Sequence, residues 1–75
     1  GEPVAEALYD QMRYYIQGLL YYNNKEFEKA IEFFDLSIQE NPEDRPSWTY
    51  FERCQYYMAN PPSPEWDGVF ELTSK

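Results

Sequence analysis

Residues 14–42, YYIQGLLYYNNKEFEKAIEFFDLSIQENP, set the fold class of this 75-residue chain. The stretch holds two runs in which apolar residues recur every three or four positions, and the polar segment NNK at 23–25 separates them. Such spacing is typical of two α-helices. Asn tolerates left-handed geometry at a helix end and also caps helices, so NNK predicts a tight turn in which Asn serves both purposes.

The first helix is predicted from Pro3 to about Tyr22. Proline suits a first helical turn, because its missing N–H would have no partner there. The apolar residues of this segment share one helix face: Val4, Leu8, Met12, Tyr15, Ile16, Leu19 and Leu20.

The second helix is predicted to end near Asn41, because Pro42 disfavours helical geometry in the residue before it. Its apolar face comprises Phe27, Ala30, Ile31, Phe34 and Ile38, and its polar face comprises Glu28, Lys29, Glu32 and Asp35.

A third helix is predicted to begin after Asp44 as N-cap, with Pro46 in its first turn. It presents Trp48, Phe51, Gln55 and Met58, and the NPPSP run at 60–64 ends it. The prediction is therefore an all-α, three-helix domain over residues 1–60, then a Pro-rich turn and an extended tail over 61–75.

The spacing of several large and small residues resembles the tetratricopeptide repeat, which has a period of roughly 34 residues. The matching positions are Tyr14, Gly18, Tyr21, Ala30, Phe34, Pro42 and Trp48. Gln17 stands where the pattern has Leu, and Glu52 stands where the next repeat has Gly. The resemblance covers residues 11–59, and it implies one complete helix-turn-helix repeat followed by a capping helix. Small residues at Gly18 and Ala30 suit a close helix crossing.

The same resemblance implies a concave groove that takes extended peptides. The residues expected to face it are Tyr15, Leu19, Tyr22, Thr49, Arg53 and Tyr56. The alternative is that these side chains only pack between the helices. For Tyr22 and Tyr56 a partly exposed surface is the favoured interpretation.

The end of the chain resembles the C-terminal segment of bacterial class III adenylate/guanylate cyclases. The matching residues are Glu52, Arg53, Cys54, Pro61, Pro62, Trp66, Asp67, Gly68, Val69, Thr73, Ser74 and Lys75. The resemblance implies a catalytic domain upstream and a membrane-associated sensor region in a parent polypeptide. The metal-binding aspartates and base-selecting residues of such cyclases are not in this sequence.

The tail is expected to dock, either on the helices or on a second copy, through Trp66, Val69, Phe70 and Leu72. Docking would complete the modest core of so small a domain, because each aromatic ring buries ~150–250 Å². The alternative is a disordered terminus.

Composition excludes several function classes. The formal net charge is −8, which argues against nucleic acid and anionic membranes as partners. There is no His, and no Ser or Cys has a recognisable general base, so no catalytic residue, cofactor or metal is assigned. Cys54 is expected to pack as a small hydrophobe and not to react. Glu28, Glu32 and Asp35 share a face that could hold a hard cation, but a solvated acidic face is favoured.

The function expected is a non-catalytic protein-interaction and regulatory domain at the C-terminus of a nucleotide cyclase. It would mediate self-association or tether a protein partner, in the cytoplasm, with the parent anchored in the inner membrane and no direct membrane contact by this segment. The alternative is a stand-alone adaptor that binds an extended peptide of another protein. A small-molecule or metal sensor is a third, less favoured hypothesis.

Overall fold

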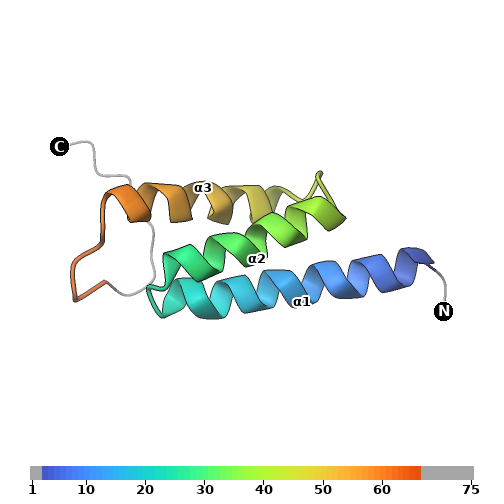
Figure 1. Ribbon diagram of the computed structural model, residues 1–75, viewed down its shortest axis with the longest axis horizontal. Helices are drawn as coiled ribbons and strands as arrows, with labels where there is room; N and C mark the ends of the chain where they lie inside the picture. Colours follow the sequence, from blue (N-terminus) through green and yellow to red (C-terminus); the bar gives the residue numbers. More distant parts are fainter. Residues whose placement is uncertain (1–2, 67–75) are drawn as a thin grey trace.

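The computed structural model describes residues 3–66, with side chains from residue 9 onwards, and this part is built from α-helices without strands. The helices are α1 (Pro3–Asn23), α2 (Phe27–Glu40) and α3 (Arg45–Ala59). The predicted all-α class is therefore confirmed, and the helix bounds lie close to the predicted ones. Helix α2 lies between α1 and α3 and packs extensively against both (Figure 1).

The turn between α1 and α2 has a left-handed residue, but that residue is Lys25, with φ 64°, and not an Asn as predicted. The backbone N–H of Glu26 donates to the carbonyl of Tyr21 at 2.9 Å, and that of Lys25 donates to the carbonyl of Tyr22 at 3.0 Å. This pair of bonds is the Schellman motif, in which Gly is usual at the left-handed position. Lys25 has a compensating contact, because its Nζ donates to the carbonyl of Pro64 at 2.9 Å.

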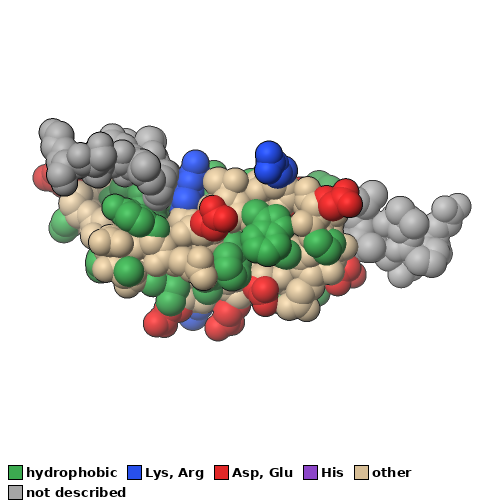
Figure 2. All heavy atoms as spheres, turned by 90° about the horizontal axis from the view of Figure 1, so that it is seen from above, with side chains coloured by type: hydrophobic (Ala, Val, Ile, Leu, Met, Phe, Trp, Pro, Cys, Tyr) green, Lys and Arg blue, Asp and Glu red, His purple; other side chains and the backbone are tan. Residues whose placement is uncertain are grey.

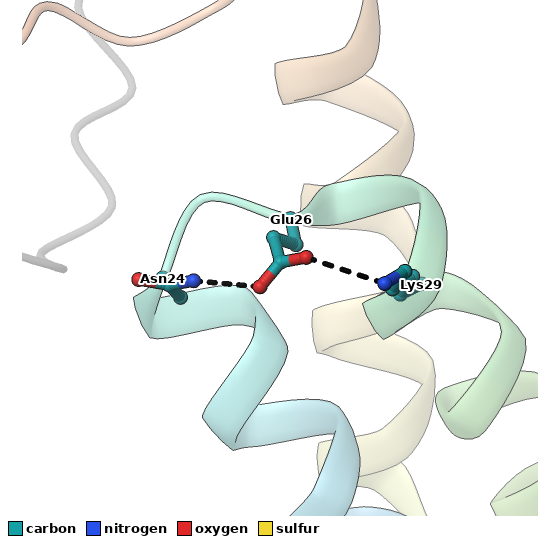
Figure 3. Close-up of polar contacts among 3 residues, drawn as sticks. All are labelled: Asn24, Glu26 and Lys29. Atoms are coloured by element: carbon teal, nitrogen blue, oxygen red, sulfur yellow. Dashed lines mark hydrogen bonds and ion pairs between the residues drawn. The ribbon is translucent and has the colours of Figure 1, made fainter.

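The start of α2 also differs from the prediction that an Asn side chain caps it. Glu26 occupies the N-cap position and makes no side-chain cap bond. Instead, Asn24 Nδ2 donates to the Glu26 carboxylate at 2.6 Å, and that carboxylate lies 3.6 Å from Lys29 Nζ (Figure 3). Asn24 thus holds a negative charge at the helix N-terminus, where the helix dipole favours it.

The predicted cap of α3 is confirmed. The Asp44 side chain accepts the backbone N–H of Ser47 at 3.1 Å and the Ser47 hydroxyl at 2.7 Å. Pro46 lies in the first turn, as predicted.

A buried chain of hydrogen bonds runs from this cap through all three helices. Ser37 Oγ and Ser47 Oγ lie 2.6 Å apart, and Gln11 Nε2 donates to Ser37 Oγ at 2.9 Å. Since the one hydroxyl proton of Ser47 goes to Asp44, the Ser37 hydroxyl donates to Ser47. This network lies at the end of the bundle where α3 begins. Each of its buried polar side chains has a hydrogen-bond partner.

The core is mainly aromatic. Its buried apolar residues are Tyr22, Phe27, Ala30, Phe34, Ile38, Cys54 and Tyr57. The apolar face predicted for α2 is confirmed, since all its members are buried or half-buried, and its polar face is exposed. Neighbouring rings meet mostly edge to face, as for Tyr22 and Phe27 with centroids 5.5 Å apart.

The faces predicted for the outer helices are only partly right. Along α1, Met12, Ile16 and Leu20 are exposed, whereas Tyr15 and Leu19 are half-buried. The side chains of Val4 and Leu8 lie outside the described ones. The side of α1 that meets α2 instead carries buried Gln11 and Gly18.

Along α3, the predicted face is wrong for all but the half-buried Phe51, because Trp48, Gln55 and Met58 are exposed. The residues of α3 that meet the rest of the bundle are Ser47, Tyr50, Phe51, Cys54 and Tyr57.

Candidate protein-interaction surfaces

The predicted peptide groove is partly filled from within the chain. Tyr22, expected to be partly exposed, has only 1% of its surface accessible, so that prediction is wrong. Its ring lies 5.0 Å from the ring of Tyr50 and 5.4 Å from that of Trp66, centroid to centroid. Tyr22 is buried because α3 and the segment after it bring these rings over it.

Tyr50 is the residue that joins the predicted groove positions, and the sequence interpretation missed it. Its ring centroid lies 6.0 Å from that of Tyr15 and stacks 5.4 Å from that of Phe34. The Arg53 guanidinium lies over the Tyr50 ring, 5.1 Å from its centroid. A helical spacing of Ser47, Tyr50, Cys54 and Tyr57 was the signal that could have revealed it.

The remaining groove positions lie at different depths. The structure brings Tyr15, Tyr22 and Arg53 together around Tyr50, and Leu19 packs half-buried against the same core. Thr49 and Tyr56 are exposed on α3, which for Tyr56 agrees with the expectation. Of the six positions predicted to face the groove, therefore, only Thr49 and Tyr56 are exposed, and the open surface is correspondingly small.

Burial governs the acid–base behaviour of the phenols. Desolvation raises the pKa of Tyr22 to about 12, and Arg53 opposes that rise only in part. Desolvation also raises the pKa of Tyr15. Both phenols are thus protonated at neutral pH. The Tyr22 hydroxyl has no hydrogen-bond partner among the described residues.

Trp66 packs on the aromatic core. Its ring centroid lies 5.7 Å from that of Phe27 and 5.1 Å from that of Tyr57, and its Nε1 donates to the Tyr57 hydroxyl at 3.2 Å. Lys25 holds the preceding turn through the carbonyl of Pro64. The other tail residues named above, Val69, Phe70 and Leu72, lie outside the described residues, so docking stays a prediction for them.

The candidate reactive and metal-binding side chains lie on α3 and α2, respectively. Cys54 is fully buried, and desolvation raises the pKa of its thiol to about 12, which disfavours the reactive thiolate. Glu28, Glu32 and Asp35 are exposed on α2. Within the described part of the chain, no group of three or more His, Cys, Asp or Glu side chains is arranged to hold a metal ion.

Four of the exposed large apolar side chains among the described residues form a row on α1, the α1 row: Tyr9, Met12, Ile16 and Leu20. Each of these side chains is between 49% and 66% exposed. A shallow hollow of about 200 Å³ runs beside the row, and Met12, Ile16, Tyr15, Gln11, Asp44 and Pro46 line it. An exposed, contiguous apolar surface of this kind marks an interaction site more often than chance.

Helix α3 carries a more interrupted apolar surface. Trp48 and Met58 are exposed, but Gln55 lies between them, and Trp48 Nε1 donates to the carbonyl of Pro42 at 2.7 Å. Figure 2 views the molecule from the α3 side and shows hydrophobic side chains separated by acidic ones. A larger open hollow of about 520 Å³ lies between the start of α2 and the end of α3, with Phe27 and Tyr57 in its wall.

Comparison of the chain with protein-family models, curated proteins and solved structures finds no significant match. Among residues 3–66, no helix is both long enough and apolar enough to cross a membrane.

Proposed function

We propose that this chain is a non-catalytic protein-interaction domain that forms the C-terminal regulatory segment of a nucleotide cyclase. Its role is to associate with a protein partner, and self-association is the favoured form. The observation that carries the interaction role is the α1 row, because four large apolar side chains remain exposed on one side of one helix. The assignment to a cyclase rests on the resemblance of the C-terminal residues.

The mechanism proposed is control by proximity. The same resemblance implies that the catalytic domains act in pairs. An appendage that dimerises would then raise the effective concentration of one catalytic domain near the other. No residue of the appendage needs to touch substrate for this to change the rate.

The peptide-adaptor alternative has less support. It needs an open groove along Tyr15, Tyr22 and Arg53, whereas Tyr22 is buried beneath Tyr50 and Trp66. The exposed positions Thr49 and Tyr56 leave only a short surface on α3.

The test is nucleotide cyclase activity of the full-length polypeptide that contains this chain, with and without residues 3–75, using ATP and GTP in parallel. Activity in both forms, with a rate or concentration dependence that changes on deletion, is the expected result. Absence of activity in a well-folded full-length protein would remove the cyclase assignment. Equal activity and equal concentration dependence in the two forms would remove the regulatory role.

A further inference from the structure

We infer that the α1 row is the contact surface of a symmetric dimer in which α1 of one copy packs against α1 of a second copy. This inference rests on the interaction role proposed above and names its partner. Its first support is the location of the row. The Met12, Ile16 and Leu20 side chains are exposed on α1, while the buried Gln11 and Gly18 face α2.

Charge favours a second copy at this face. From Tyr9 to Asn24 the only charged residues are Asp10 and Arg13, and their side chains form an ion pair at 3.6 Å. Residues 25–66, by contrast, hold nine acidic and four basic residues, a formal charge of −5. The hollow beside the row adds one acidic neighbour, Asp44. Two acidic copies therefore repel each other less across this α1 surface than across the acidic remainder of the chain.

The row is also complementary to itself when two copies pack in antiparallel orientation. Tyr9 then opposes Leu20 of the second copy, and Met12 opposes Ile16, so each large side chain meets an apolar one. The row spans 11 residue steps, or about 16 Å of helix, which is enough for three turns of helix–helix contact. The hollow beside Met12 and Ile16 offers room for a side chain of the opposing helix.

The area sets the strength of the dimer. Each half-exposed side chain of the row contributes roughly 100 Å², so the row contributes about 400 Å² per copy and the pair about 800 Å². This total lies just below the lower limit of specific interfaces, about 1,000 Å². The expected product is therefore a weak, reversible dimer that forms at high local concentration, such as the one that a paired parent protein provides.

The experiment is sedimentation equilibrium of the chain from about 10 µM to 1 mM, with three variants. Ile16→Glu and Leu20→Glu each introduce a charge into the row at exposed positions, so the fold is retained. Gln17→Glu adds the same charge to the same helix, one residue away from Ile16, at an exposed position outside the row. Far-UV circular dichroism of each variant checks its helix content.

The expected result is a concentration-dependent dimer for the unmodified chain, at least about tenfold weaker dimerisation for the two row variants, and near-unchanged dimerisation for Gln17→Glu. A chain that stays monomeric to 1 mM overturns the inference. Equal weakening by all three variants also overturns it, because net charge and not contact would then be the cause. The cyclase assignment is tested separately by activity, so either proposal can fail without the other.

Discussion

Gly18 faces the ring of Phe34 so closely that a β-carbon added to it would lie 2.7 Å from Phe34 Cε1. Carbon atoms do not approach to that distance without displacement. The ring cannot easily yield, because it is fully buried and contacts the rings of Tyr15 and Tyr50, at 5.9 and 5.4 Å between centroids. The absence of a side chain at Gly18 therefore sets how close α1 lies to α2.

Replacement of Gly18 by Ala is expected to lower the free energy of unfolding by about 1–3 kcal/mol, although Ala favours helix by ~1 kcal/mol over Gly. Urea unfolding followed by circular dichroism measures it. The matched control, Gln17→Ala at the neighbouring exposed position, should be neutral or slightly stabilising. A stabilised Gly18→Ala chain would mean that the helices do not cross this closely.

The contacts of Trp66 predict that the segment after α3 contributes to stability. Trp66→Ala removes ring contacts with Tyr22, Phe27 and Tyr57 and is expected to lower the free energy of unfolding by about 2–3 kcal/mol. Trp48→Ala should cost less, because Trp48 is exposed, and its side chain meets the ring of Phe51 and donates a hydrogen bond to the Pro42 carbonyl. Equal losses for the two tryptophans would contradict the docking of Trp66.

Removal of the hydroxyl is expected to lower stability at Tyr57 but not at Tyr22. Tyr57→Phe removes the acceptor of the Trp66 indole N–H and should cost about 0.5–1.5 kcal/mol. Tyr22→Phe removes a buried hydroxyl that has no partner among the described residues, so it should be neutral or stabilising by up to about 1 kcal/mol. Thermal and urea unfolding of both variants decide the point, and a clear loss for Tyr22→Phe would reveal a partner for that hydroxyl.

The Asp44 side chain, which caps α3, is expected to contribute more to stability than the exposed side chain of Glu43. Asp44→Ala leaves the Ser47 backbone N–H and hydroxyl without their acceptor and should cost about 1–2 kcal/mol. Glu43→Ala, one residue earlier and exposed, is the control and should be near neutral. If Asp44→Ala and Glu43→Ala lower the free energy of unfolding equally, the Asp44 cap does not stabilise the buried hydrogen bonds of Ser47 and Ser37.

Alkaline pH is expected to unfold the chain through Tyr22 and Cys54. Burial raises both pKa values to about 12, from ordinary values of 10.0 and 9.0, so the unfolded chain loses these protons first. Stability is then complete below about pH 9 and falls as pH rises toward 12, by at most about 1.4 kcal/mol per pH unit for each group. Urea unfolding between pH 8 and 11 measures the slope.

Tyr22→Phe removes one of the two groups, so its stability should fall less steeply above pH 10 than that of the unmodified chain. Identical slopes would show that the Tyr22 hydroxyl titrates normally in the folded chain.

Much of the fold follows from short-range signals. Pro42 ends α2, Asp44 caps α3, and the prolines at 61–64 follow the end of α3, each because of its own backbone chemistry. The turn between α1 and α2 was found at the right place with the wrong residue in left-handed geometry. A local preference pointed to Asn, but Lys25 takes that position while its ammonium group binds the Pro64 carbonyl, far along the chain.

Local spacing was sufficient for the number, order and ends of the helices, since hydrogen bonds within a helix and the caps at its ends depend on neighbouring residues. It was also sufficient for α2, which has one apolar face. It could not choose the buried side of α1 or α3, because each carries apolar side chains on more than one side. Tertiary packing decides which sides are buried. The sides that carry Gly18 on α1 and Cys54 on α3 face the core, and Trp66 covers Tyr22. The α1 row stays exposed.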